Sequence, residues 1–179
     1  MRGRARGRVL RFVPALVLGA LWLVVAGPSD SATGTTASFT LTAGSLTITQ
    51  PATATLGVAS TGALTLSGSL GTVSVSDGRG LLTATWTASV VSTNFTTGGG
   101  STYETVTASN IAYASGTAIT TGVGVFTPGV LASMSSSGTA GSWAGNGDNT
   151  ASWNPTITFT LSPSQVAGTY SGTVTHSVA

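Results

Sequence analysis

The residues able to do acid–base or nucleophilic chemistry are few in this chain. Its one histidine, His176, stands three residues from the end. A Ser-His-Asp triad needs a nucleophile and an orienting acid within reach of such a base, and the sequence contains no Gly-x-Ser-x-Gly elbow. We therefore expect His176 to be a structural residue of a terminal strand, and not a general base.

Carboxylates are the next candidates, because glycoside cleavage uses a pair of them. Asp77, Glu104 and Asp148 fall in three separate turn-like segments, so a pair is not indicated. Asp77 is followed by Gly78 and Arg79, and we interpret it as a turn residue whose carboxylate bonds the local backbone or Arg79.

The stretch AGNGDNT, residues 144–150, offers side-chain oxygens from Asn146, Asp148 and Asn149. It lacks the number of acids and the spacing of a calcium loop, so we expect a solvated turn. The sequence thus predicts no catalytic residue, no metal site and no cofactor.

The N-terminus has the layout of a secretory signal. Five of the six arginines lie in the first eleven residues, ahead of an apolar run of 14 residues, 13–26. That run is shorter than the roughly 20 residues needed to cross a bilayer, and VVAG suits cleavage after Ala26. We expect a signal peptide over residues 1–26, a flexible mature N-terminus over 27–37 and a single domain over 38–179. The protein should be secreted, with no membrane span after signal removal.

Without that segment the chain is almost uncharged. Arg79 is then the one basic side chain against four acids, a side-chain charge of −3. No basic patch remains to neutralise phosphates, so we expect neither nucleic acid nor an anionic membrane as a partner. Cysteine is absent, so stability must come from the core and not from disulfides.

Alternating apolar and polar residues predict strands along the chain. The clearest run has apolar residues on one face and Thr or Ser on the other: Leu82, Ala84, Trp86, Ala88 and Val90. Turn-rich segments separate such runs, and a long polar stretch over residues 133–150 is expected to be an exposed loop. We predict an all-β fold, an antiparallel β-sandwich of about eight short strands.

Residues 38–50 are expected to contribute one of these runs. Phe39, Leu41 and Ala43 share one face, whereas Leu46 and Ile48 fall on the other parity. A bulge or kink at the intervening Gly44 would restore the inward face.

Aromatic rings are the remaining binding candidates, since exposed rings commonly bind sugars. Trp143 and Trp153 flank the polar GNGD turn, so we predict them as glycan contacts. Trp86 has an inward parity and is expected to lie in the core.

Two segments in their order along the chain resemble the WxL domain, a cell-surface module of Gram-positive bacteria. VSVSDGRG, residues 73–80, is similar to the family's V-x-D-x-R-G turn, with Asp77, Arg79 and Gly80 at the matching positions. TATWTASV, residues 83–90, follows it as the first Trp-x-Leu strand, with Ala88 in place of Leu.

The second segment, SPSQVAGTYSGTVTHSVA, is similar to the family's final stretch. It supplies Gly168 and Tyr170 at the expected spacing, with His176 in place of the second Trp and Val178 in place of Leu. What the resemblance implies is noncovalent attachment to the cell wall through peptidoglycan, without catalysis or cofactor, and assembly with other surface proteins.

Two alternatives stay open. The protein could be a structural or adhesive subunit of a surface assembly, because low charge and an open sheet edge favour strand pairing between subunits. A glycan-acting hydrolase is the third and least favoured, since ionisable groups are scarce.

Overall fold

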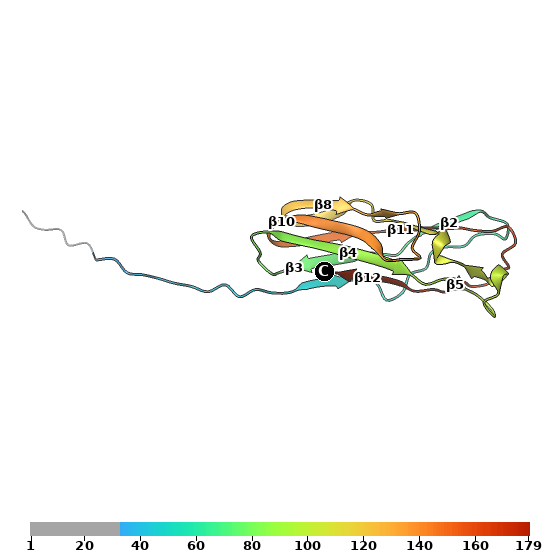
Figure 1. Ribbon diagram of the computed structural model, residues 1–179, viewed down its shortest axis with the longest axis horizontal. Helices are drawn as coiled ribbons and strands as arrows, with labels where there is room; N and C mark the ends of the chain where they lie inside the picture. The colour runs from blue at the N-terminus through green and yellow to red at the C-terminus, as the bar shows by residue number, and fades with distance from the viewer. Residues whose placement is uncertain (1–32) are drawn as a thin grey trace, which may run out of the picture. The chain divides into compact units, whose positions relative to one another are not determined.

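The structure, a computed structural model, describes residues 33–179. The predicted signal peptide and residues 27–32 lie outside this range. The described chain consists of strands joined by turns, with all strand pairs antiparallel, which confirms the expected all-β class (Figure 1). Residues Thr40–Ala179 form one compact unit. Among residues 33–179, no helix has the length and apolar character needed to span a membrane.

The elements follow one another in this order: β1 (Leu46–Thr49), β2 (Thr65–Ser69), β3 (Val73–Asp77), β4 (Ala84–Ser92), β5 (Phe95–Thr96), the 3-10 turn η1 (Thr102–Glu104), β6 (Thr105–Val106), the 3-10 turn η2 (Ala108–Asn110), β7 (Ile111–Ala114), β8 (Ala118–Pro128), β9 (Val130–Leu131), β10 (Gly138–Trp153), β11 (Thr156–Thr160) and β12 (Val174–Val178).

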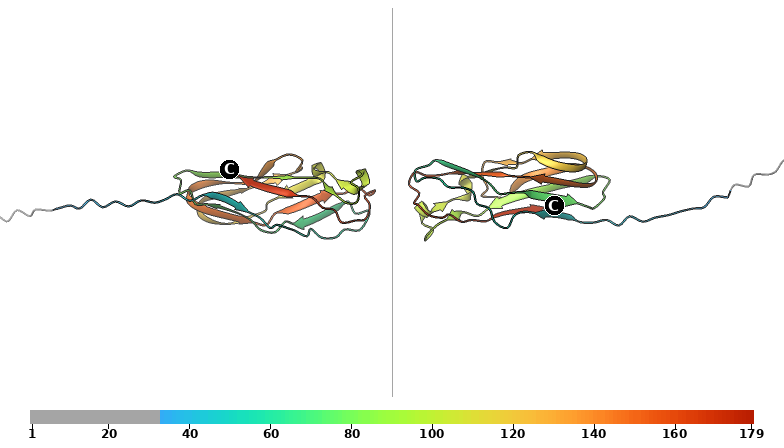
Figure 2. Two further views of the ribbon diagram at one scale, coloured as in Figure 1. Left: turned by 90° about the horizontal axis from the view of Figure 1, so that it is seen from below. Right: turned by 180° about the vertical axis from the view of Figure 1, so that it is seen from behind.

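Two sheets and a short ribbon organise these strands. The larger sheet has the order β1-β3-β10-β4-β12 with β8 also paired to β10, the smaller has β2-β11-β7-β9, and β5 pairs with β6. Strand β10 is central because one of its edges pairs with β8, while the other pairs first with β4 and then with β3. The further views of Figure 2 show these strands stacked in layers.

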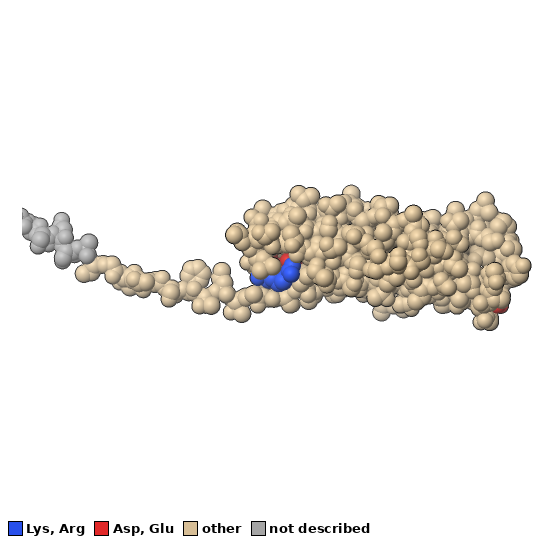
Figure 3. Space-filling view, viewed as in Figure 1, with Lys and Arg blue, Asp and Glu red and all other residues tan. Residues whose placement is uncertain are grey.

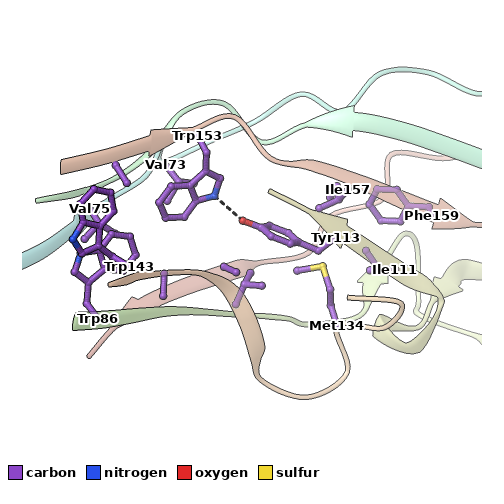
Figure 4. Close-up of a cluster of buried hydrophobic side chains, with 14 of the residues drawn as sticks. Val73, Val75, Trp86, Ile111, Tyr113, Met134, Trp143, Trp153, Ile157 and Phe159 are labelled. Carbon is purple, nitrogen blue, oxygen red and sulfur yellow. Dashed lines mark hydrogen bonds between the residues drawn. The ribbon is translucent and has the colours of Figure 1, made fainter. Parts of the chain in front are cut away.

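The core lies between the inner faces of the sheets. Every second residue of β4 is buried, with Trp86 2% exposed and Ala88 fully buried, as the period of two requires. The smaller sheet contributes Ile111, Tyr113 and Phe159 to the same cluster, part of which Figure 4 shows. Because no disulfide exists in the described chain, this apolar burial is the main stabilising term.

The predicted strand over residues 38–43 is wrong for this chain. Residues 33–45 have no regular secondary structure, and the side chains of Phe39 and Leu41 are 86% and 85% exposed. Pairing begins at Leu46 in β1, just after the amide of Gly44 donates to the Gly78 carbonyl at 2.7 Å. We call residues 33–43 the arm.

The predicted loop over residues 133–150 is wrong as well. Most of it belongs to β10, the longest strand, whose inward side chains include Ala140, Trp143 and Ala151. Small inward residues and glycines hid the alternation, because Ala and Gly do not contrast with Ser and Thr as Val or Leu would.

Candidate functional site

The turn after β3 is held by an ion pair between neighbours in the sequence. The Arg79 Nε donates to Asp77 Oδ1 at 2.8 Å and its Nη2 to Oδ2 at 2.9 Å, while the Arg79 backbone N–H donates to Oδ1 at 3.1 Å. These bonds from Arg79 hold the pKa of the buried Asp77 carboxyl below its ordinary value. The Asp77 carboxylate thus bonds the local backbone and Arg79, as expected, from the last residue of β3.

The same arginine fastens the turn to the next strand. Its Nη2 also donates to the Thr85 carbonyl at 2.9 Å, one residue before Trp86. Gly80 has a φ of +63°, a left-handed conformation that glycine adopts without strain. The residues that the resemblance singled out at this turn therefore set the start of β4.

Trp86 is buried, as its parity predicted, and its indole nitrogen is satisfied. The Nε1–H donates to Asn149 Oδ1 at 2.8 Å, and Asn149 Nδ2 donates to the Gly147 carbonyl at 3.2 Å. Asn149 stands opposite Asp77 in the pairing of β10 with β3. Asn149 is thus a structural residue that the sequence reasoning placed in a solvated turn.

The two segments that carry the resemblance end in neighbouring strands. In the β12–β4 pair, Val178 stands opposite Ala88 and His176 opposite Val90. His176 is 8% exposed and Ala88 is fully buried, so these positions line the interior rather than the surface. The Ala88 side chain is consequently not free to contact a ligand, whereas Val178 is half-buried and His176 lines a groove described below.

His176 is part of a chain of hydrogen-bonded polar groups that runs from exposed Gln50 to buried Trp153. Its Nδ1 lies 2.6 Å from Gln50 Oε1, and its Nε2 lies 3.2 Å from the Tyr113 hydroxyl. Trp153 Nε1–H donates to that hydroxyl at 2.9 Å (Figure 4). All groups are satisfied when neutral His176 donates from Nδ1 and accepts at Nε2 from the tyrosine.

Burial shifts the pKa values of His176 and Tyr113 in the directions that keep both side chains neutral. It lowers the pKa of His176 to about 4 and raises the pKa of Tyr113 to about 12, the latter against an opposing effect of the Trp153 donor. A structural role for His176, as predicted, fits this geometry. Both ring nitrogens, Nδ1 and Nε2, already take part in hydrogen bonds, so neither is free to act as a general base.

The prediction that Trp143 and Trp153 contact glycan is wrong for this structure. Their side chains are 3% and 2% exposed, since both point inward from β10. Trp143 stacks on Trp86 across the strand pair, with ring centroids 6.5 Å apart and planes at 9°. Neither ring can stack on a sugar without opening the core.

The predicted site residues near the C-terminus organise a surface loop. The hydroxyl of Tyr170 donates to the Val166 carbonyl at 2.9 Å, with the Tyr103 carbonyl as an alternative acceptor at 3.1 Å. Gly168 lies against the side chain of Thr97, where a Cβ would not fit. These contacts tie residues 162–173 to the β5 region.

That loop forms one side of a groove that the sequence reasoning missed. The groove has a volume of about 940 Å³ and runs between residues 50–63 and residues 162–174. None of its lining residues is charged. One sequence signal could have revealed it, because a connection as long as the one from β1 to β2 without secondary structure of its own is uncommon in compact domains.

Acidic groups do not converge anywhere in the described chain. Glu104 caps η1 by accepting from the Ser101 backbone N–H at 2.9 Å, whereas Asp148 is an exposed residue of β10. Within residues 33–179 there is no group of three or more His, Cys, Asp or Glu placed to hold a metal ion. The face drawn in Figure 3 is correspondingly almost free of charge.

Comparison with protein-family models, with curated proteins and with solved structures found no match to this chain. The function has to be inferred from the geometry of the chain itself.

Proposed function

We propose that the protein is a non-catalytic subunit of a surface assembly held together by strand pairing. The observation that carries the proposal is the arm. Its apolar residues alternate with Thr and Ser, as in a half-buried strand, yet Phe39 and Leu41 are almost fully exposed. Exposing two large apolar side chains on an extended segment is unfavourable, and pairing with another chain would bury them.

A second feature of the same kind supports this proposal. Strand β8 pairs with β10 alone among the described residues, so one edge of this long strand is free. Ile119, Val123 and Val125 on it are 68% to 83% exposed, and residues 118–128 carry no charge. Soluble proteins usually protect such edges with charged residues, which are missing here.

Light scattering on a size-exclusion column tests the proposal. The sample is a chain that begins after Ala26, so that the apolar run of residues 13–26 does not aggregate by itself. We expect species larger than a monomer whose proportion rises with concentration, and a decrease of roughly tenfold or more in self-association for the variant Phe39→Asp/Leu41→Asp. A strict monomer at millimolar concentration contradicts the proposal.

The matched control carries the same charges on the other face of the arm. Thr40→Asp/Thr42→Asp adds two carboxylates to the same segment, at positions that alternate with Phe39 and Leu41. Assembly should persist in this variant, because the polar face of a paired strand stays in water. Equal loss in both variants means that charge alone, and not strand pairing, is responsible.

Association with the cell wall is a second candidate. The observation that favours it is the adjacency of β4 and β12, because the two segments similar to the WxL domain lie on these neighbouring strands. Sedimentation with purified insoluble peptidoglycan tests it. Recovery of folded protein entirely in the supernatant, with its fold verified by circular dichroism, argues against wall binding.

A further inference from the structure

The groove is bordered by a stretch of backbone that lacks hydrogen-bond partners. Among the described residues, 51–59 take part in no backbone–backbone hydrogen bond, although they lie along the compact unit next to β2. Most of these residues are exposed, so their backbone N–H and C=O groups are open to water or to another chain. This border is therefore able to accept a strand, provided that one enters the groove.

The floor of the groove is apolar. Buried Phe95 and Phe159 lie at its base, together with the half-buried side chains of Leu66, Leu70 and Leu161. These residues belong to the core or pack directly against it. The core is thus incompletely covered on this side, and an apolar segment placed there would remove the exposed part from water.

The arm has the chemistry that this floor requires. Ala37, Phe39, Leu41 and Ala43 share one parity, so in a strand they would point to one side at intervals of about 6.6 Å. The arm has no charged side chain, and neither has the lining of the groove. No charge would be buried when the two come together, which is a requirement for a stable apolar contact.

The hydrogen bonds at the start of β1 disfavour insertion of the arm into the groove of the same molecule. The arm precedes β1, and at that end of β1 the Gly44 amide donates to Gly78 O while the Gly78 amide donates to Ser45 O. The groove begins at Gln50, past the opposite end of β1. To enter it, the arm would have to reverse direction beside these two bonds, whereas the groove of another molecule needs no reversal.

We propose that residues 33–43 of one copy of this chain insert as a strand into the groove between residues 51–59 and 162–173 of a second copy. This inference rests on the proposed function and names the segment and the surface that it uses. The contact joins two different surfaces, so a pair of copies still has one free arm and one free groove, and assembly continues as an open chain of subunits.

Two single substitutions at exposed apolar residues separate the groove from the β8 edge. Val58 lines the groove and is 95% exposed, whereas Ile119 on β8 is 83% exposed and does not line it. We expect Val58→Asp to reduce self-association about tenfold or more and Ile119→Asp to leave it unchanged, both measured by light scattering. If Ile119→Asp reduces self-association and Val58→Asp does not, the groove is not the docking surface. Assembly through the arm would still stand in that case.

Disulfide trapping identifies the partner directly, because the chain has no cysteine of its own. A Leu41→Cys chain is mixed under oxidation with an affinity-tagged chain carrying Ala54→Cys on the border of the groove. We expect a disulfide-linked heterodimer, formed at least several-fold faster than with Thr40→Cys, which has the opposite parity. A double variant Leu41→Cys/Ala54→Cys that closes into a disulfide within one monomer, in place of linked oligomers, overturns insertion into a second copy.

Discussion

At the scale of single residues, the few ionisable groups of the domain serve its structure. Asp77 is 1% exposed and accepts three hydrogen bonds from Arg79, two from the side chain and one from the backbone. A buried carboxylate is tolerated only when its lone pairs are satisfied, and here a residue two positions away satisfies them. The turn is therefore self-contained and needs no ligand to explain its charges.

Replacing this carboxylate should destabilise the fold. We expect Asp77→Asn to lower the free energy of unfolding by about 1–3 kcal/mol, because the amide cannot accept from Arg79 at both of its terminal atoms. Urea denaturation measures the change. Asp148→Asn, at an exposed position of β10, is the matched control and should stay within about 0.5 kcal/mol of the parent.

The buried histidine predicts a pH dependence of stability. Burial lowers the pKa of His176 from 6.5 to about 4, so between these values the unfolded chain binds a proton that the folded chain does not. The free energy of unfolding should be independent of this group above pH 6.5. It should fall as the pH drops from 6.5 to 4, by at most about 1.4 kcal/mol per pH unit, and level off below.

Urea denaturation at several pH values measures this slope, and His176→Gln provides the reference. Asp77 has a pKa lowered from 3.8 and stays ionised over this window, so its loss of stability comes at lower pH. The difference between parent and variant therefore isolates the imidazole. An identical slope in both proteins contradicts the assignment of a neutral histidine.

At the scale of the elements, β10 determines how closely the strands approach one another. Gly145 stands opposite Ala84 on β4 and Gly124 on β8. A Cβ on Gly145 would lie 2.8 Å from the Gly124 Cα and 2.7 Å from Trp143 Nε1. Two glycines facing each other thus leave the space in which the Trp143 ring packs.

We expect Gly145→Ala to destabilise the protein by about 1–3 kcal/mol, because the added methyl meets backbone that cannot move without separating β8 from β10. Thermal unfolding followed by circular dichroism measures the loss. Ala144→Ser, at the exposed neighbouring position, should change stability by less than about 0.5 kcal/mol. Equal stability of Gly145→Ala and the parent would mean that these strands are farther apart than described.

The elements also show where sequence patterns succeed. Strands β3, β4 and β11 were predictable because branched or aromatic side chains mark their inward positions. The alternation in the arm was equally clear. It indicates an apolar face that should be buried, but it does not indicate whether the same molecule or another one buries it. The long connection from β1 to β2 was a signal for one side of the groove, but the pairing of its two sides could not be predicted, because they lie about a hundred residues apart in the sequence.

At the scale of the whole molecule, the three indoles of the described chain report on one shared core. Trp86, Trp143 and Trp153 are each at most 3% exposed. In a chain that begins after Ala26 these are the remaining tryptophans. We expect acrylamide and iodide to quench the native emission much less than that of the urea-unfolded chain. Equal quenching before and after unfolding contradicts the buried positions of all three rings.

The central place of β10 also has a consequence for the time course of folding. Its partners β3, β4 and β8 all come earlier in the chain, and β12 returns to pair with β4 at the very end. Apart from the β1–β3 pair, the larger sheet cannot close before about residue 150 has been synthesised. Contacts so distant in sequence form slowly, on a scale of milliseconds to seconds. A polypeptide that leaves the ribosome N-terminus first consequently stays open, and able to be threaded through a narrow channel, until about residue 150 has emerged.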